Sequence, residues 1–478
     1  MRAAAALDQL RERLDVSAFN FSRCRQFFKF LFHKKIAIQS SRTHNHLLNV
    51  IHAKNPRQIA AMVLWRRKAS SEFTEKLLET ALAEFNLSSA DRRLCQELVY
   101  GVVRWQAALD WLIDRKTGGR GDRVVLQLGL YQIFWLDKIP PHAAVHESVE
   151  LAKQLSGRNS GFVNAVLRGC LREFDANKKL LDELKIKRPA IGWSHPEWLV
   201  ARWQERFGAK KLAHLLKWNN TPPKTYARVN TLKTDAGKLV EKWRIEDVEY
   251  DFDQHDWLKE NLAFTAFDLK SHPPLASLES FRDGWFYIQD PSTLLAPILL
   301  NAQPGETILD LCAAPGGKTT FIAQLMNNEG KIVASDISEE RLKLIQENCT
   351  RLGVTCVETV LSSALDAKPS AFDRILVDAP CSNTGVMRRR VDLRWRISPE
   401  EISRLKRTQL DLLKLAATKL KPGGVLIYST CSLEPEENSE VVKEFLCEHK
   451  NFKLEDEREL LPFADNVDGA FVAQLNLR

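Results

Sequence analysis

Apolar side chains recur every three or four positions from about residue 71 to residue 174, which is the spacing of amphipathic helices. Residues 88–91 are typical of a helix N-terminus, and Gly118 and Gly119 interrupt the pattern. Residues 139–141 indicate a sharp turn before a helix that starts near His142. Strand signals are sparse here, so the pattern predicts an all-α domain of several helices.

A mixed pattern follows the helical stretch. Residues 196–218 keep the helical spacing, and residues 236–243 are typical of a short helix. Residues 225–230 and 285–288 have the composition of strands. The region therefore predicts a small α+β connector.

Strand and helix patterns alternate regularly after Pro291. Strands are predicted at 307–313, 331–336, 356–361, 374–378 and 424–429. Helices are predicted near 318–327, 338–352, 398–420 and 437–449. Such alternation favours an α/β domain with a parallel sheet that helices cover on both faces.

These patterns predict a multidomain chain, as its length of 478 residues suggests. We divide it into a basic extension (1–60), a helical domain (61–185), a connector (186–288) and an α/β domain (289–478). The composition, 44% hydrophobic and 27% charged, is that of a globular protein, and no apolar run approaches the length of a membrane span. The nine cysteines include no Cys-x-x-Cys pair, so we expect reduced thiols, no metal site and a cytoplasmic location.

The net charge of +8 is concentrated at one end of the chain. Residues 1–60 contain 11 Lys/Arg and 3 Asp/Glu, and 11 − 3 = 8, whereas the other 418 residues carry 58 of each sign. Any RNA-binding surface of the folded body must therefore be a local patch. The basic stretch is interpreted as a segment before a true start at Met62, in preference to a basic arm or a transit peptide.

A glycine-rich turn follows the first strand of the α/β region. Residues 310–319 read Asp-Leu-Cys-Ala-Ala-Pro-Gly-Gly-Lys-Thr and lead directly into a helix, at whose positive end the backbone can approach a ligand. A Walker A loop requires glycine where Cys312 stands, and the G-x-G-x-x-G fingerprint is absent. Asp336 ends the second strand, where an acid holds a ribose diol or caps a helix. Together these features favour an adenosine-containing cofactor.

Two cysteines and an acid follow the last two predicted strands. Asp378 and Cys381 come after the fourth strand and Cys431 after the fifth, so a doubly wound sheet brings them to the cleft of the glycine turn. A lone buried cysteine is usually inert, but two beside a cofactor loop favour thiol chemistry. A thiolate that adds to C6 of cytosine makes C5 nucleophilic, and an acid such as Asp378 near N3 stabilises the charge in the ring. The base must leave its stack to reach the cleft.

Charged residues flank both cysteines. Between Cys381 and the next helix lie arginines that we expect to contact RNA phosphates at the mouth of the cleft, although such a run is more often a solvated loop: Arg388, Arg389, Arg390, Arg394 and Arg396. The acids after Cys431 are interpreted chiefly as first-turn residues of the following helix: Glu434, Glu436 and Glu437.

These motifs together resemble the RsmB/Sun/Fmu family of bacterial 16S rRNA cytosine-C5 methyltransferases, and the similarity extends from about residue 60 to 478. In the helical region the segments similar to the family's NusB-like RNA-binding domain are 97–105, 129–132 and 139–145. Residues 226–231 and 289–292 are similar to the family's connector and to the start of its catalytic domain. The resemblance implies a NusB-like domain, a connector and a Rossmann-like methyltransferase domain that uses S-adenosylmethionine.

The resemblance also implies residue roles. The cofactor would lie against Cys312, Ala313, Ala314, Pro315, Gly316, Gly317 and Lys318. Asp336 would hold the ribose, and Asp378 would lie between cofactor and base. Cys431 would be the nucleophile and Cys381 would help to release the product, whereas the residues alone leave the reverse assignment open.

The predicted activity is methylation of C5 of a cytosine in 16S rRNA, either free or in an early assembly intermediate, by a monomer that does not bind membranes. A transfer RNA enzyme remains an alternative because the catalytic motifs are shared. A non-catalytic NusB-like RNA-binding factor is a second alternative, against which the two cysteines, Asp378 and the glycine turn argue. A small-molecule methyltransferase needs neither two thiols nor so much accessory structure.

Overall fold

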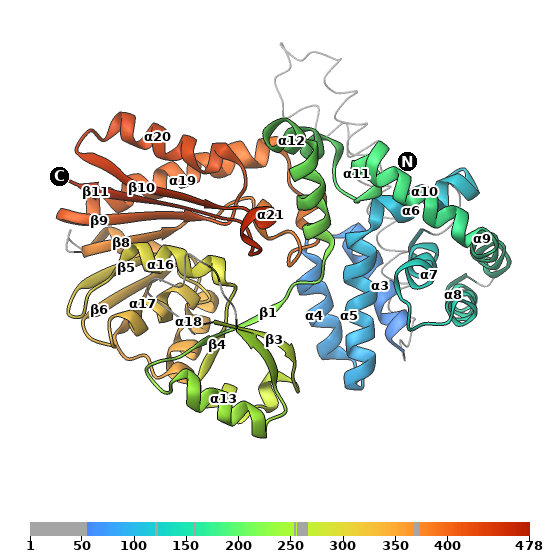
Figure 1. The fold of residues 1–478 in the computed structure, drawn as a ribbon, viewed down its shortest axis with the longest axis horizontal. Coiled ribbons are helices and arrows are strands. Elements are labelled where there is room, and N and C mark those ends of the chain that lie inside the picture. Colours follow the sequence, from blue (N-terminus) through green and yellow to red (C-terminus); the bar gives the residue numbers. More distant parts are fainter. Residues whose placement is uncertain (1–54, 120–122, 157–158, 253–254, 256–265, 368–371) are drawn as a thin grey trace, which may run out of the picture. The chain divides into compact units, whose positions relative to one another are not determined.

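The computed structural model describes residues 55–119, 123–156, 159–252, 255, 266–367 and 372–478 (Figure 1). Within these residues the chain forms two compact units. One contains residues up to 102 together with 112–174, and the other contains 103–111 together with 175–478.

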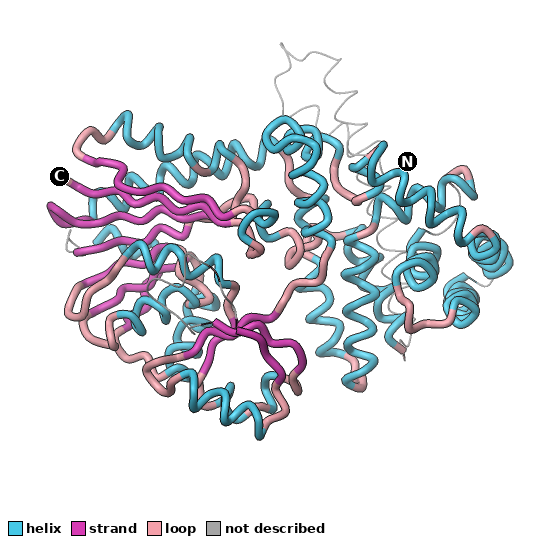
Figure 2. Tube along the Cα trace, viewed as in Figure 1, coloured by secondary structure: helices cyan, strands magenta, loops and turns pink. Residues whose placement is uncertain are grey.

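Helices and the loops that join them form the described residues of the first unit, without a strand, as Figure 2 shows, which confirms the all-α prediction. The helices that contribute to it are α3 (Pro56–Ala69), α4 (Thr74–Glu84), α5 (Ser89–Arg104), α6 (Gln106–Thr117), α7 (Arg123–Trp135), α8 (Pro141–Ser156) and α9 (Ser160–Arg172). Helix α7 is buried over almost its whole length, as its nearly unbroken apolar sequence requires.

Helix α3 crosses the boundary that we predict at residue 60. Asn55 caps this helix, since its side chain accepts from the backbone N–H of Arg57 and Gln58, and the Gln58 side chain accepts from Asn55 N in return. Ile59 and Ala60 are fully buried. A chain that started at Met62 would therefore lack the cap and the first turns of a core helix.

The second unit begins with helices and a small sheet. Its helices are α10 (Phe174–Lys187), α11 (Pro189–Gly192), α12 (Glu197–Asn220), α13 (Ala236–Ile245) and α15 (Glu279–Arg282). The strands β1 (Thr225–Val229), β2 (Glu249–Phe252), β3 (Ala266–Ser271) and β4 (Phe286–Ile288) pair antiparallel in the order β2-β3-β1-β4. Trp243 of α13 packs edge-to-face on Phe267 and Phe286 of this sheet. The predicted α+β connector is observed, with two strands that the pattern did not reveal.

A larger sheet forms the rest of this unit. Its strands are β5 (Thr307–Leu311), β6 (Lys331–Asp336), β7 (Val357–Leu361), β8 (Phe372–Asp378), β9 (Leu420–Thr430), β10 (Phe452–Leu460) and β11 (Ala470–Leu477). Its helices are α16 (Leu295–Leu300), α17 (Gly317–Leu325), α18 (Glu339–Leu352), α19 (Pro399–Lys419), α20 (Ser439–Glu448) and α21 (Pro462–Asp465). Apolar strand residues alternate between the two faces: Ile308 and Ile427 pack with α16, α17 and α18, whereas Leu309 and Tyr428 pack with α19 and α20. The helices thus cover both faces, as predicted.

The larger sheet is mixed rather than parallel. Its order is β10-β11-β9-β8-β5-β6-β7, and β11 pairs antiparallel with both β9 and β10. The sequence analysis predicted no strand after residue 449, and this was wrong. The reason is visible in β10, an edge strand whose outward side chains are mostly charged and half or fully exposed, so its apolar signal is weak.

The order β9-β8-β5 places three strands side by side with parallel direction. Their carboxyl ends therefore meet at one edge of the sheet. Within the described part of the chain, the search for a helix long and apolar enough to cross a lipid bilayer finds none.

Candidate active site

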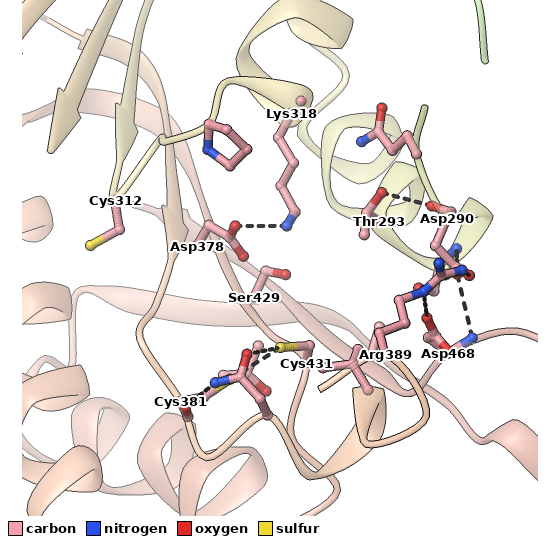
Figure 3. A pocket seen from close by; sticks show the side chains of 18 of the residues that line it. Asp290, Thr293, Cys312, Lys318, Asp378, Cys381, Arg389, Ser429, Cys431 and Asp468 are labelled. Carbon is pink, nitrogen blue, oxygen red and sulfur yellow. Dashed lines mark hydrogen bonds and ion pairs between the residues drawn. The ribbon is translucent and has the colours of Figure 1, made fainter. Parts of the chain in front are cut away.

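A cavity of about 560 Å³ opens at the carboxyl ends of β5, β8 and β9 (Figure 3). Its walls include the glycine-rich turn, Asp378, Cys381 and Cys431, the groups that the strand order predicted to meet. Residues 287–290 from the connector and Asp468 complete the lining on the opposite side. A cavity of this size is typical of small-molecule and cofactor sites.

The glycine-rich turn depends on two unusual backbone positions. β5 ends at Leu311, and Cys312 and Gly316 have φ values of 59° and 98° before α17 begins. A Cβ on Gly317 would lie 3.1 Å from Tyr287 Cε1, so glycine allows the turn to pack closely against the connector. The first turn of α17 consequently lies at the cavity wall, where unpaired backbone N–H groups favour an anionic group.

Acidic side chains surround this turn. Asp310 is fully buried and accepts a hydrogen bond of 2.6 Å from Thr319 Oγ1, and burial raises the pKa of Asp310 to about 7. Lys318 Nζ lies 2.7 Å from Asp378 Oδ2. Burial opposes the charge on Lys318, but the Asp378 carboxylate outweighs this effect and raises the pKa of Lys318. The lysine and the aspartate therefore form a charged pair at the centre of the cavity.

The two thiols face each other across the same cavity. Cys381 Sγ and Cys431 Sγ are 3.4 Å apart, and Cys431 Sγ also lies 3.1 Å from Asn383 Oδ1. The hydrogen bond with Cys431 and burial both raise the pKa of Cys381. Cys381 is thus held as a neutral thiol, and Cys431 is the more accessible of the two.

Comparisons with known proteins identify the family. A family model described as 16S rRNA methyltransferase RsmB/F matches residues 297–476, a NusB family model matches 54–172, and an RsmF/B-like ferredoxin-like domain model matches 195–265. A probable ribosomal RNA small subunit methyltransferase B of Bacillus subtilis is 36% identical over 408 residues, which cover 83% of this chain and 89% of that protein. The chain belongs to this methyltransferase family.

A second relative agrees with this assignment, and a solved structure has a similar fold. The Synechocystis protein described as a probable ribosomal RNA small subunit methyltransferase B is 35% identical over 449 residues, with 88% of this chain and 98% of that protein covered. The crystal structure of PH0851 is similar in fold, with a TM-score of 0.71 and 24% identity over 88% of this chain and 99% of that one. The helical first unit is accordingly a NusB-like domain, and the large mixed sheet is the Rossmann-like methyltransferase domain.

The predicted cofactor residues of this family member do not all reach the cavity. Cys312, Lys318 and Asp378 line it, together with residues 313–315 and 317, whereas Gly316 and Asp336 are not among the lining residues. Asp336 is almost fully buried, and its carboxylate accepts from Ala314 N at 3.0 Å and from Arg341 Nε at 2.6 Å. Arg341 therefore lies between the cavity and the acid that the sequence predicted to hold the ribose, a partner that no motif revealed.

The arginine segment differs most from its prediction. Arg388 and Arg394 are buried, and Arg388 lies over the Trp218 ring and pairs with Asp290 and Asp468. Neither is accessible to RNA phosphates, so the prediction is wrong for these two. Arg396 is half-buried and pairs with Asp392 at 2.6 Å. Two arginines of the segment line the cavity, Arg389 and the exposed Arg390.

The acids after Cys431 are not simple first-turn residues. Glu434 and Glu437 are fully buried, and they precede α20, which begins at Ser439. Glu434 accepts from Arg202 and from Trp203 Nε1 of α12, and Glu437 accepts from side chains of both cysteine loops. An isolated sequence could not reveal this, because Arg202, Trp203 and Ser382 come from segments distant in the sequence.

Proposed function

We propose that this methyltransferase transfers a methyl group from S-adenosylmethionine to C5 of a cytosine in 16S rRNA, through a covalent bond between Cys431 Sγ and C6 of the base. The observation that carries the proposal is the pair of thiols 3.4 Å apart beside the glycine-rich turn and Asp378. Two cysteines that only formed a disulfide, packed in the core or bound a metal would not require an acid and a cofactor-binding turn in the same cavity.

The residues of the turn fit this cofactor. S-Adenosylmethionine supplies the methyl group from a cationic sulfonium, and it also carries an ammonium and a carboxylate. Asp378 provides negative charge at the cavity wall, whereas the N-terminus of α17 favours the carboxylate. We assign cofactor binding to residues 312–318 and Asp378, and the ribose to Asp336 and its partner Arg341.

The side chains around the base can perform each covalent step. The Cys431 thiolate would add to C6, so that the electron pair of the C5–C6 double bond is available at C5 to accept the methyl group. Water in the cavity would then accept the C5 proton, the electrons of the C5–H bond would restore the C5–C6 double bond, and the electrons of the C6–sulfur bond would return to Cys431 Sγ. The Asp378 carboxylate, held by Lys318, would accept from the N4 amino group beside N3 of the ring. The Cys381 thiol would donate a hydrogen bond to Cys431 Sγ as the C6–sulfur bond breaks.

Substrate specificity is the finer part of the proposal. The NusB-like domain favours ribosomal RNA over transfer RNA, and we propose 16S rRNA, free or in an early assembly intermediate, as the partner of a monomeric enzyme. Arg389 and Arg390 at the cavity wall would contact phosphates near the flipped base.

The substrate is tested with radiolabelled S-adenosylmethionine and unmodified 16S rRNA or transfer RNA, followed by nucleoside analysis. We expect label in 5-methylcytidine from 16S rRNA alone. Label in transfer RNA would keep the chemistry but overturn the substrate. Label in neither RNA nor in early small-subunit particles would favour the non-catalytic alternative.

The covalent step is tested by changing each cysteine. Cys431→Ala should abolish transfer, whereas Cys381→Ala should accumulate an enzyme–RNA adduct that survives denaturing electrophoresis, because the bond forms but is not broken. The greater accessibility of Cys431 supports this order of roles, because the nucleophile must reach C6 of the base. An adduct with Cys431→Ala instead would exchange the roles of the two cysteines.

A further inference from the structure

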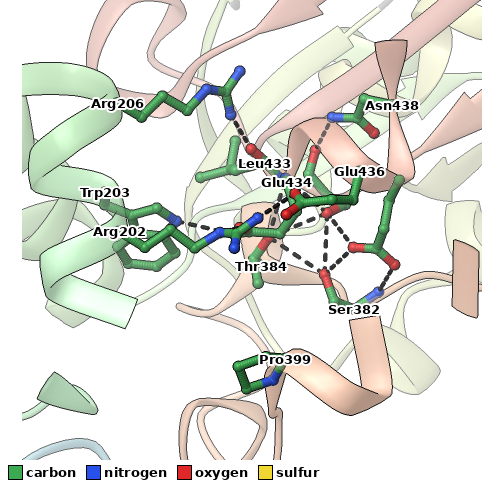
Figure 4. A network of polar contacts seen from close by, with 12 residues as sticks. Arg202, Trp203, Arg206, Ser382, Thr384, Pro399, Leu433, Glu434, Glu436 and Asn438 are labelled. Carbon is green, nitrogen blue, oxygen red and sulfur yellow. Dashed lines mark hydrogen bonds and ion pairs between the residues drawn. The ribbon is translucent and has the colours of Figure 1, made fainter. Parts of the chain in front are cut away.

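The loops that carry the two cysteines run side by side and are joined by hydrogen bonds. Gly385 N donates to Cys431 O at 2.9 Å. Leu433 N donates to Thr384 Oγ1 at 2.8 Å, and Figure 4 shows these two residues side by side. A Cβ on Gly385 would lie 2.7 Å from Cys431 O, so any larger residue would push the loops apart. The distance between the thiols is therefore a property of the joined loops rather than of either cysteine.

Glu437 binds both loops with one carboxylate. Oε1 accepts from Ser382 N at 2.8 Å, and Oε2 accepts from Ser432 Oγ at 2.5 Å and from Ser382 Oγ. Ser382 directly follows Cys381, and Ser432 directly follows Cys431. The carboxylate thus spans the two residues that lie next to the thiols.

The bridge is buried and made by neutral donors. Gln409 Nε2 donates to Glu437 Oε1 at 3.1 Å and also to Pro380 O, the residue before Cys381. Burial raises the pKa of Glu437, and the hydrogen bonds from Ser382, Ser432 and Gln409 oppose that shift. A fully buried carboxylate that accepts four hydrogen bonds has strong and directional partners, which restrict the positions of both loops.

Helix α12 fixes the same loop from the other side. Arg202 binds Glu434 and Glu436, Trp203 Nε1 donates to Glu434 Oε1 at 3.0 Å, and Arg206 binds Leu433 O. As Figure 4 shows, these side chains approach the segment that contains Leu433 and Glu434, whereas Ser382 and Thr384 lie on its opposite side. The loop after Cys431 is consequently held between α12 and the Cys381 loop.

We propose that Glu437 is a positioning residue that sets the separation and orientation of the Cys381 and Cys431 thiols. Glu437 does not line the cavity, and its hydrogen bonds to the two loops are made with Ser382 and Ser432 rather than with either sulfur. It therefore acts on the thiols through these two serines. The effect of Glu437 on catalysis rests on the proposed function, in which both thiols must reach the same cytosine ring. The effect of Glu437 on the distance between the two thiols does not depend on the proposed function.

The test measures both consequences in the full-length protein. Diamide oxidises two neighbouring thiols to a disulfide: the thiols lose two electrons and two protons, and diamide becomes the hydrazine. The rate of this closure, followed by mass spectrometry, reports how close the two thiols are. Methyl transfer to 16S rRNA gives kcat and KM. For Glu437→Gln we expect the rate of disulfide closure and kcat each to fall at least about tenfold, with KM for S-adenosylmethionine unchanged. The reason is that a small misplacement of reacting groups can lower a reaction rate up to about a hundredfold.

Glu440→Gln is the matched control. Glu440 is exposed on α20 and pairs with Lys406, so the same substitution three residues away should leave closure and kcat at wild-type values. If Glu437→Gln does not fold, Ser432→Ala replaces it, because this change removes only one arm of the bridge and should also slow closure. A folded Glu437→Gln protein whose rate of disulfide closure and kcat equal those of the wild type would overturn the proposal. If the wild-type protein methylates no RNA and Glu437→Gln still slows disulfide closure, the proposed function is overturned and the positioning role of Glu437 is kept.

Discussion

Burial divides the arginines of residues 388–396 by function. Arg394 is fully buried, and its guanidinium donates to Asn220 Oδ1 at 2.7 Å and to Asn219 O at 2.9 Å; burial lowers its pKa to about 9. Arg390 is exposed at the cavity wall. One arginine therefore stabilises the fold, and the other is free to meet the substrate from the cavity.

The same substitution is expected to lower stability at Arg394 and to weaken RNA binding at Arg390. Arg394→Gln should lower the melting temperature, because it leaves several buried acceptors without their donor, at a cost of about 1–3 kcal/mol for each such group. Arg390→Gln should raise KM for RNA several-fold and leave the melting temperature unchanged. Thermal unfolding and initial-rate kinetics measure both effects. If Arg394→Gln weakened RNA binding without loss of stability, its buried position would not describe the protein in solution.

Asp310 predicts a pH-dependent stability. Its pKa is 3.8 without perturbation and about 7 in the fold, so between these values the folded state retains a proton that the unfolded state has lost. Its contribution to the free energy of unfolding therefore falls as pH rises towards 7. Asp310→Asn cannot ionise, so its melting temperature relative to wild type should increase from about pH 5 to about pH 8 without cofactor. An equal difference at both pH values would contradict the raised pKa.

Local chemistry explains which site residues the sequence could predict. Cys381, Cys431 and the glycine turn follow predicted strands, and strand order alone brings them to one edge. Glu437 and Arg341 gain their roles from partners in other segments, Ser382 in one case and the buried Asp336 in the other. Such pairs have no fixed spacing along the chain, so a single sequence does not indicate them.

At the scale of elements, the same distinction applies to strands and helices. The five strands of the parallel part of the sheet were all predicted within a few residues, because most of them carry short apolar runs that helices cover on both faces. β7, at the edge, is only partly buried. β10 is buried only at its two ends and is mostly charged between them, so it becomes a strand by pairing with β11 at the edge of the sheet. The short strands β2 and β3 of the connector likewise become strands by pairing.

Helix α3 predicts a difference between two start positions. Residues 55–61 provide its cap and its buried Ile59, Ala60 and Ala61. A protein that starts at Met62 should lose about 3 kcal/mol or more of unfolding free energy relative to one that starts at Asn55, from the cap and Ile59 alone. Urea unfolding of the two proteins measures the difference. Equal stabilities would show that the turn before Met62 contributes nothing to the core.

At the scale of the whole molecule, charge is distributed unevenly. Starting the protein at Asn55 removes 10 Lys/Arg and 3 Asp/Glu, which changes the net charge from +8 to 59 − 58 = +1. Net charge affects long-range attraction to RNA, whereas specific binding needs cations at the phosphates that they contact. In the rest of the chain such cations must act locally, and Arg389 and Arg390 at the cavity wall are the ones that we propose.

A salt titration separates these two sources of RNA affinity. The logarithm of the RNA affinity falls with the logarithm of salt concentration in proportion to the number of phosphates contacted. We expect the protein that starts at Asn55 to retain the slope of the full chain and its kcat/KM within about twofold, because we propose that the RNA contacts belong to the NusB-like domain and the cavity. A smaller slope together with weaker binding would instead make residues 1–54 a basic RNA-binding arm. KM for S-adenosylmethionine should be insensitive to salt in both proteins, since its charged groups bind inside the cavity, where screening is weaker.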